Sequence, residues 1–287
     1  MDYQGIPIDL IALEKTLPIL ARPWGKVARD HSLPQYDFDF RTYFECSSLY
    51  RFEPGQRAIH RMGSILNYTE LEATCAERGI ELLTSARDYH LCSELTGWYP
   101  LITDLTPRSV VFDKFPSLTD VTSQFQWPVF MKGERQTSAH KRELAIIESA
   151  EQFKKAEVAY VQDPILNWQK IVVREFLPLR SAGESTNLVI PTSFEFRSFW
   201  WKGELAGIGP YWLKQLQTTL EELTAATAIA QEAARRIGAP FIVIDVAQTQ
   251  TGRWIVIECN DAQESGYAGV KPMLLWRKIL DLERQFS

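Results

Sequence analysis

The segment Phe241-Ile-Val-Ile-Asp-Val-Ala247 is followed, after a short connection, by Trp254-Ile-Val-Ile-Glu-Cys-Asn-Asp261. Both segments are rich in β-branched and aromatic residues, which predicts two strands. Thr251-Gly252 in the connection predicts the turn between them. Each apolar run contains one carboxylate, Asp245 or Glu258, at a position where a charge is costly unless it is paired or bound to a metal.

The acidic residues of this strand pair can share one face of a sheet. Glu258 and Asn260 are two positions apart, so their side chains project to the same side of a strand. An antiparallel partner strand can bring Asp245 beside them. Two carboxylates and an amide oxygen are ligands that magnesium prefers when phosphates complete its coordination. The alternative is that Asp245 and Glu258 are solvent-facing strand residues.

Outward from this pair, the chain alternates strand-like and helix-like patterns. The apolar spacing from residue 216 to residue 237, followed by Gly238 and Pro240, predicts a long amphipathic helix. A hairpin is predicted at 194–208, with its turn at Lys202-Gly203. Further strands are predicted at 57–60, 80–83, 110–112, 128–131 and 171–177, further helices at 65–78, 143–156 and 273–286, and a linker at 98–107.

Composition restricts the classes of protein to which the chain can belong. It has 287 residues, of which 45% are hydrophobic and 23% charged, and these are ordinary globular values. The net charge of −5 does not favour a general nucleic-acid surface. No apolar run is long enough to span a bilayer, and the N-terminus lacks a secretory pattern. The four cysteines show no CxxC spacing, so we expect free thiols and a cytoplasmic protein.

The segments Ile242-Val-Ile-Asp245 and Ile257-Glu-Cys-Asn260, joined by a short hairpin, resemble the metal-binding end of the ATP-grasp superfamily. The resemblance covers about residue 107 to the C-terminus. It implies that Asp245, Glu258 and Asn260 hold Mg²⁺ on the β- and γ-phosphates of ATP. The pattern is also similar to a divergent ATP-grasp clade named for two arginines and a lysine.

The resemblance assigns phosphate-binding roles to lysines. Lys114 resembles the lysine that precedes a helix in this family, and Lys132 resembles the one at the end of the next strand. A cation fixed at a strand end can neutralise phosphate charge; for Lys114 the alternative is a surface residue. The family closes a loop over the triphosphate where this chain has residues 133–141, which gives Lys141, Arg135 and His140 as candidate phosphate contacts, His140 alternatively being a solvated loop residue.

Two further elements carry family roles. The end of the strand at 171–177 resembles the hinge that reads the adenine edge, which implies base contacts by Glu175, Phe176 and Leu177. Arg197 lies in an aromatic strand, from which a guanidinium can contact a γ-phosphate or an acyl-phosphate. The alternative is that Arg197 pairs with a glutamate of its own hairpin, Glu195 or Glu204.

We therefore expect an α+β protein with an ATP-grasp fold, two subdomains at 106–177 and 178–287 that clasp ATP, and a small α/β pre-ATP-grasp domain at 1–105. The implied function is an ATP- and Mg²⁺-dependent carboxylate–amine ligase that acts through an acyl-phosphate, on an amino acid, a peptide or another small molecule. Residues 1–105 and the segment 263–271 are expected to help to recognise the substrate. The alternatives are a small-molecule kinase and a nucleotide-binding protein without catalysis.

Overall fold

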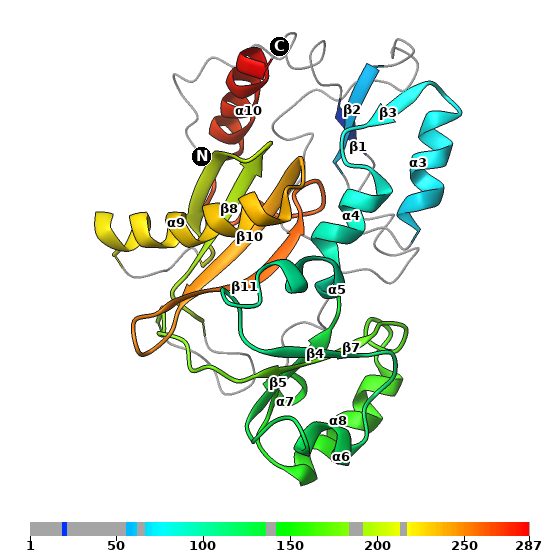
Figure 1. The fold of residues 1–287 in the computed structure, drawn as a ribbon, viewed down its shortest axis with the longest axis vertical. Helices are drawn as coiled ribbons and strands as arrows, with labels where there is room; N and C mark the ends of the chain where they lie inside the picture. Colours follow the sequence, from blue (N-terminus) through cyan, green and yellow to red (C-terminus); the bar gives the residue numbers. More distant parts are fainter. Residues whose placement is uncertain are drawn as a thin grey trace.

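The computed structural model describes residues 19–21, 56–61, 67–135, 142–183, 192–212 and 217–286. Its elements form three sheets with helices packed against them (Figure 1). Because helices accompany sheets that are mostly antiparallel, the α+β class predicted from the sequence is confirmed.

The largest antiparallel pairing confirms the predicted strand pair. β10 (Phe241–Gln248) lies between β11 (Trp254–Asp261) and β8 (Glu195–Trp201), and β8 pairs in turn with β9 (Glu204–Pro210). The sheet order is therefore β11-β10-β8-β9. The β8–β9 hairpin turns where predicted, with positive φ angles of 48° at Lys202 and 86° at Gly203, as a tight two-residue turn requires.

Helix α9 (Leu220–Ile237) covers one face of this sheet (Figure 1). It begins where Thr219 and Glu222 form a reciprocal capping box, and it ends at Gly238, which has a φ of 70°. The prediction of this helix is confirmed, although its start lies later than residue 216, which falls outside the described residues. Helix α10 (Pro272–Phe286) packs against β8 and β9 and confirms the predicted C-terminal helix.

Alternation along the strands gives this sheet two different faces. Phe196, Trp200 and their neighbours on β10 face α9 in one buried cluster. Phe199 and Trp201 face the other way, into a cluster that includes residues of α10. That second face carries charge further along, because Glu195 and Arg197 alternate in phase with Phe199. Apolar burial thus fixes the side to which the charged groups point.

The second sheet has the order β4-β7-β5-β6 and lies at the bottom of Figure 1. It contains β4 (Ser109–Phe112), β5 (Val129–Gly133), β6 (Ile146–Ile147) and β7 (Ile171–Glu175), paired antiparallel. Residues from α6 (Leu118–Thr122) and α8 (Ala150–Gln162) pack on one face in a buried cluster with these strands. The opposite face carries Phe130, Lys132 and Arg174.

The helix predicted at 143–156 is wrong in its centre. The chain forms a short helix α7 (Arg142–Ala145), then β6, and then α8, which begins after Ser149. Ile146 and Ile147 pair with Phe130 and Val129 of β5. Edge pairing with β5 buries these two β-branched residues, and the Ser149 side chain caps a new helix.

The N-terminal elements form a three-stranded parallel sheet of β1 (Ile19–Ala21), β2 (Gln56–Arg61) and β3 (Ile80–Leu82). Helix α3 (Tyr68–Ala76) connects β2 to β3 and begins after Asn67. These elements confirm the predicted strand–helix–strand order. A domain boundary at residues 105 and 106 stays a prediction.

The linker predicted at 98–107 is wrong in its first part. Helices α4 (Ala86–Ser93) and α5 (Leu95–Trp98) run into a 3₁₀ turn, η3 (Tyr99–Leu101). Pro100 stands in the first positions of that turn, where a proline needs no backbone N–H donor. Trp98 is buried in the cluster that includes α9, and Tyr99, the residue before Pro100, packs against it in a helical conformation. Tertiary packing therefore outweighs the bias of a pre-proline residue away from helix.

Within the described residues, no helix is both long and apolar enough to cross a membrane.

A close backbone approach fixes the segment after β11 against β9. A Cβ at Gly209 would lie 2.6 Å from the carbonyl carbon of Gly269 and 2.7 Å from its oxygen, so only glycine fits there. Gly209 is also the register partner of Arg197. The approach therefore holds the segment beside the charged part of the sheet.

We predict that Gly209→Ala lowers the free energy of unfolding by about 1–3 kcal/mol, because backbone atoms cannot move aside as side chains do. Gly207→Ala is the matched control on the same face of β9. Its Cβ would meet only side-chain atoms, Val270 Cγ1 at 2.9 Å and Leu275 Cδ1 at 3.4 Å, so it should cost less. Urea unfolding measures both losses. Equal losses would contradict this account.

Candidate functional site

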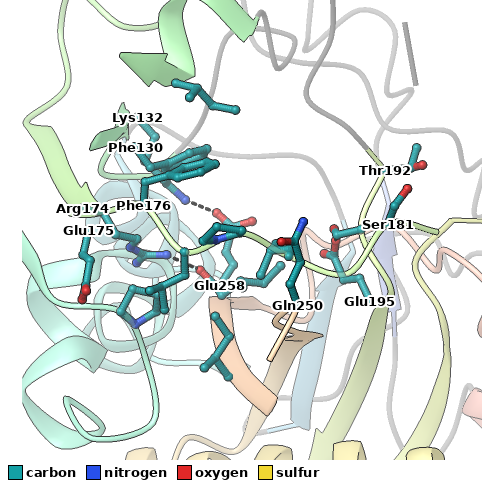
Figure 2. Close-up of a pocket in the computed structure, with 18 of the residues that line it drawn as sticks. Phe130, Lys132, Arg174, Glu175, Phe176, Ser181, Thr192, Glu195, Gln250 and Glu258 are labelled. Carbon is teal, nitrogen blue, oxygen red and sulfur yellow. Dashed lines mark hydrogen bonds and ion pairs between the residues drawn. The ribbon is translucent and has the colours of Figure 1, made fainter. Parts of the chain in front are cut away.

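A cleft of about 560 Å³ lies between the two four-stranded sheets (Figure 2). One wall comes from β5, β6 and β7, and the other from β8, β11 and the β10–β11 connection. The lining includes aromatic and aliphatic side chains together with charged groups. Its residues are Pro107, Phe130, Lys132, Arg142, Ile146, Arg174, Glu175, Phe176, Leu177, Pro178, Leu179, Ser181, Thr192, Ser193, Glu195, Tyr211, Trp212, Gln250, Ile255, Ile257 and Glu258.

Part of the cleft is an apolar slot. Phe130 and Ile146 line it from one sheet, and Ile255 and Ile257 line it from β11. The chain leaves β7 beside this slot after Glu175, the last residue that pairs with β5, so residues 176 and 177 lie outside the ladder. Backbone groups outside a ladder are available to hydrogen-bond a ligand. The slot therefore suits a flat, mostly apolar ring with polar edges.

A row of charges crosses the other wall. The strand register places Asp245 of β10 directly between Arg197 of β8 and Glu258 of β11. Arg197 donates from Nε to Asp245 Oδ1 at 2.9 Å and from Nη2 to Oδ2 at 2.7 Å. Its Nη1 donates to the carbonyl of Gly266 at 3.0 Å. This bidentate geometry is the strongest form of a carboxylate–guanidinium pair.

Burial makes the Arg197–Asp245 pair obligatory. Asp245 is 1% exposed and Arg197 is 7% exposed. Burial alone lowers the pKa of Arg197, but the Asp245 carboxylate outweighs it and raises that pKa above its ordinary value. Arg197 therefore stays charged. Its partner is neither Glu195 nor Glu204, the glutamates that the sequence suggested as the alternative to a phosphate contact.

Lys132 connects the row to the opposite sheet. Its Nζ forms an ion pair with Glu258 Oε1, and Figure 2 shows the two side chains pointing toward each other. The Lys132 side chain is 7% exposed and that of Glu258 is 29% exposed. Both residues line the cleft. The structure thus places Lys132 at a strand end facing the acidic strand pair, and its role in phosphate binding stays a prediction.

Arg174 is a cleft residue that the sequence interpretation missed. It donates from Nη1 to the carbonyl of Ile257 at 2.7 Å and from Nε to Ser109 Oγ at 2.9 Å. Burial lowers its pKa to about 10. The contact with Ile257 is a second link between the sheets, next to the Lys132–Glu258 pair. A charge inside the apolar run Ile171-Val-Val-Arg-Glu175 was the available signal.

Glu195 is a second missed residue, because the sequence presents it only as a partner for Arg197. It is buried on β8, lines the cleft, and accepts a hydrogen bond from Ser193 Oγ at 2.7 Å. Burial, with the nearby charge of Asp245, raises the pKa of the Glu195 carboxyl to about 8. Its alternation with Arg197 on one strand face was the signal.

The remaining predicted residues divide into three groups. Glu175, Phe176 and Leu177 line the cleft. Lys114 is exposed after β4 and is not among the described residues that line the cleft. Lys141 and His140 lie outside the described residues.

The oxygen donors near the cleft determine whether it can hold a divalent cation. Among the described residues, no three His, Cys, Asp or Glu side chains are grouped to hold a metal. Asp245 is committed to Arg197, whereas Glu258 is partly exposed and Asn260, two residues along β11, is half-buried. Glu258 at the cleft and Asn260, two residues along the same strand, fit Mg²⁺ if anionic ligand oxygens complete its octahedron. The donor set therefore fits Mg²⁺ brought with phosphates.

Comparison with known proteins agrees with this geometry. The family model that matches describes an ATP-grasp domain, family 3 of the clade named for two arginines and a lysine, and it covers residues 100–279. No curated protein sequence matches the chain.

Solved ATP-grasp structures share the fold. A RimK domain protein ATP-grasp from Sphaerobacter thermophilus is 15% identical, with a TM-score of 0.58 over 92% of this chain and 98% of that one. VanG D-Ala:D-Ser ligase from Enterococcus faecalis is 16% identical, with a TM-score of 0.55 over 80% and 72%. An ADP complex of PurK, a carboxyaminoimidazole ribonucleotide synthetase, is 10% identical, with a TM-score of 0.51 over 71% and 52%.

We predict that Arg197→Met lowers the free energy of unfolding by about 3–5 kcal/mol, because it leaves Asp245 buried without its cation. The double variant Arg197→Met with Asp245→Leu removes both charges and should recover most of that loss. Urea unfolding of both variants provides the measurement. If the double variant is less stable than the single variant, the unpaired charge of Asp245 is not the cause of the loss, and the prediction is wrong.

The pKa of Glu195 predicts a pH dependence. With a pKa near 8 in the folded protein and an ordinary value of 4.5, the folded state holds a proton that the unfolded state releases. The contribution of Glu195 to the free energy of unfolding is fully present below pH 4.5 and is lost as the pH rises to about 8. The stability of Glu195→Gln relative to the wild type should therefore increase across this range and then level off. A constant difference between the two unfolding curves would contradict the assignment.

Proposed function

Because the chain belongs to the ATP-grasp family, in family 3 of the clade named for two arginines and a lysine, we propose that it binds ATP with Mg²⁺ in the cleft and uses it to activate a carboxylate. The observation that carries the proposal is the Lys132–Glu258 ion pair, which lies at the cleft end of the charged row, beside an apolar slot. A ring and a polyphosphate are the two ligand parts that such a cleft accommodates together.

The slot supports a position for adenine. Phe130 and Ile146 would contact one face of the base, and Ile255 and Ile257 the other. The base contacts expected of Glu175, Phe176 and Leu177 lie at the end of β7. Glu175 is the last paired residue, and Phe176 and Leu177 follow it, where backbone groups can read the base. The PurK structure, which has the same fold, is an ADP complex, and this supports an adenine nucleotide as the ligand.

The ion pair supports a position for the phosphates. Lys132 and Glu258 neutralise each other, and each could exchange its partner: Lys132 for a phosphate oxygen, and Glu258 for a divalent cation. Glu258 and Asn260 would hold Mg²⁺, and Asp245 would stay paired with Arg197 behind them. When bound, the ion would neutralise charge on the phosphates and polarise the γ-phosphorus. Lys114 is exposed, so we leave it out of the proposed site.

The proposed reaction needs positioning and charge neutralisation more than a general base. A substrate carboxylate oxygen would bond to the γ-phosphorus while the bond to the ADP oxygen breaks, giving an acyl-phosphate. An amine nitrogen would then bond to the acyl carbon, lose a proton, and release phosphate. Lys132 would hold the phosphates, Arg197 would fix Asp245 beside them, and Lys141 remains a candidate contact.

The substrates proposed are an amino acid, a peptide or another small carboxylate, together with an amine. VanG, which shares the fold, is by its title a D-Ala:D-Ser ligase. Cys92 and Cys259 are buried thiols outside any disulfide, which supports the proposed cytoplasmic location.

The deciding assay mixes the protein, ATP and Mg²⁺ with pools of amino acids and peptides. Phosphate release that depends on both a carboxylate and an amine supports ligation. ADP formation with the phosphate retained on an acceptor hydroxyl identifies a small-molecule kinase. ATP binding without ADP formation identifies a nucleotide-binding protein without catalysis, and the absence of ATP binding contradicts the proposal entirely.

We predict that Lys132→Met weakens the binding of a non-hydrolysable ATP analogue with Mg²⁺ by about 10- to 100-fold, because a charged hydrogen bond to phosphate is lost. Lys155→Met, on the exposed face of α8, is the control. It keeps the same change of side chain away from the cleft, so its dissociation constant should equal that of the wild type. Titration calorimetry measures both, and equal affinities for the two variants would contradict the assignment of Lys132.

A further inference from the structure

A buried polar cluster joins the N-terminal elements to both walls of the cleft. We name it the tyrosine junction; its members are Tyr68, Tyr89, Arg135, Gln263 and Glu264. Tyr68 belongs to α3 and Tyr89 to α4, Arg135 follows β5, and the other two follow β11. The two tyrosine rings stack with their centroids 4.1 Å apart. Three parts of the chain that are far apart in sequence therefore meet at one point.

The Tyr89 hydroxyl is the centre of the junction. It donates to Glu264 Oε1 at 2.6 Å and accepts from Arg135 Nη2. The Arg135 guanidinium also lies over the Tyr89 ring, 5.2 Å from its centroid. Burial and the Glu264 charge raise the pKa of Tyr89 well above its ordinary value, so the hydroxyl keeps the proton that it donates. Both bonds of this chain are charge-assisted, which makes them stronger than neutral ones.

The segment after β11 is tied to the N-terminal elements at a second point. Gln263 accepts from the His60 backbone N–H at 2.7 Å and donates to the Tyr68 hydroxyl at 3.0 Å. It also donates to Asp261 Oδ2 at 2.9 Å. Gln263 is 1% exposed. Its side chain thus acts inside the protein, although the sequence suggested that the segment 263–271 recognises substrate.

The end of β5 is tied to the same N-terminal elements. Glu134, next to Arg135, accepts from the Thr96 backbone N–H at 3.0 Å and from the Thr96 hydroxyl. Lys132, in β5, stands three residues before Arg135. The position of Lys132 therefore depends on helices α4 and α5.

The junction and the Lys132–Glu258 pair connect the same two chain segments. Lys132 and Arg135 belong to one segment, and Glu258 and Glu264 belong to the other. In the structure, two independent links hold these segments together. One is the Lys132–Glu258 ion pair, and the other is the pair of hydrogen bonds that joins Arg135 to Glu264 through the Tyr89 hydroxyl. A triphosphate that takes Lys132 from Glu258 removes the first link. The hydrogen bonds of Tyr89 with Arg135 and Glu264 then remain, beside the Arg174 contact with Ile257, to keep the lysine strand and the acidic strand at a fixed separation.

We propose that Tyr89 is a positioning residue of the cleft, whose hydroxyl keeps the strand of Lys132 and the strand of Glu258 at the separation that the triphosphate needs. The inference rests on the proposed nucleotide binding. It assigns to the N-terminal elements a role in nucleotide affinity in addition to any part in substrate recognition.

The test uses Tyr89→Phe in the full chain, which keeps the stacked ring and removes the hydroxyl. The dissociation constant of a non-hydrolysable ATP analogue with Mg²⁺ should rise about tenfold. Stability without ligand should change less, because the Lys132–Glu258 pair still holds the segments. Tyr160→Phe is the matched control: Tyr160 is a buried tyrosine whose hydroxyl donates to the Leu144 carbonyl at 3.0 Å, away from the junction. It should leave the dissociation constant unchanged.

A second variant separates positioning from general destabilisation. Glu264→Leu removes the acceptor of the Tyr89 hydroxyl and so breaks the other link, and the double variant with Tyr89→Phe should bind about as weakly as either single variant. Affinity losses that multiply in the double variant, or a Tyr89→Phe affinity equal to the wild type, would overturn the inference alone. A wild-type protein that does not bind the analogue would overturn both the inference and the proposed function.

Discussion

The fold around the cleft depends on a row of four charges across four strands, Lys132, Glu258, Asp245 and Arg197, in which the two carboxylates lie between the two cations. Each charge has an oppositely charged neighbour, which offsets the cost of keeping it out of water. The row lies on a sheet face whose other end is packed with aromatic side chains. Without internal neutralisation, four charges could not be placed so close to an apolar core. The row also joins the two sheets, because Lys132 belongs to one and its partner to the other.

This neutralisation explains how the same groups can serve a ligand. The Arg197–Asp245 pair is bidentate and almost fully buried, so it is a fixed part of the sheet. The Lys132–Glu258 pair lies at the cleft and is partly exposed on the Glu258 side. In the proposed function it exchanges its partners for a phosphate and a cation. The two pairs of the row therefore have different roles in this proposal. The inner pair, Arg197–Asp245, holds the sheet together, and the outer pair, Lys132–Glu258, opens to a ligand. The tyrosine junction is the constraint that we propose keeps the two strands in place during that exchange.

The sequence predicted those features that depend on local patterns. The strands around Asp245 and Glu258, the hairpin at Lys202 and the helix ending at Gly238 all follow from periodicity and turn chemistry. Features that depend on tertiary contacts were missed: Ile146 and Ile147 read as helix until pairing with β5 is known, and Trp98 reads as linker until its burial is known. In the site, Lys132 stood out by its strand-end position. Arg174 could not be assigned, because its contact with Ile257 comes from the opposite wall of the cleft. Glu195 could not be assigned, because its burial near Asp245 depends on the pairing of β8 with β10. For Lys114 the sequence left a phosphate contact and a surface position as alternatives.

The central claim is that the outer ion pair is the place where a nucleotide's phosphates enter. A crystal structure of the protein with a non-hydrolysable ATP analogue and Mg²⁺ tests it most directly. The account predicts the base between Phe130 and Ile257, Lys132 on a phosphate oxygen, the cation on Glu258 and Asn260, and Arg197 still paired with Asp245. A nucleotide bound elsewhere, or one bound in the cleft while Lys132 remains on Glu258, would contradict it.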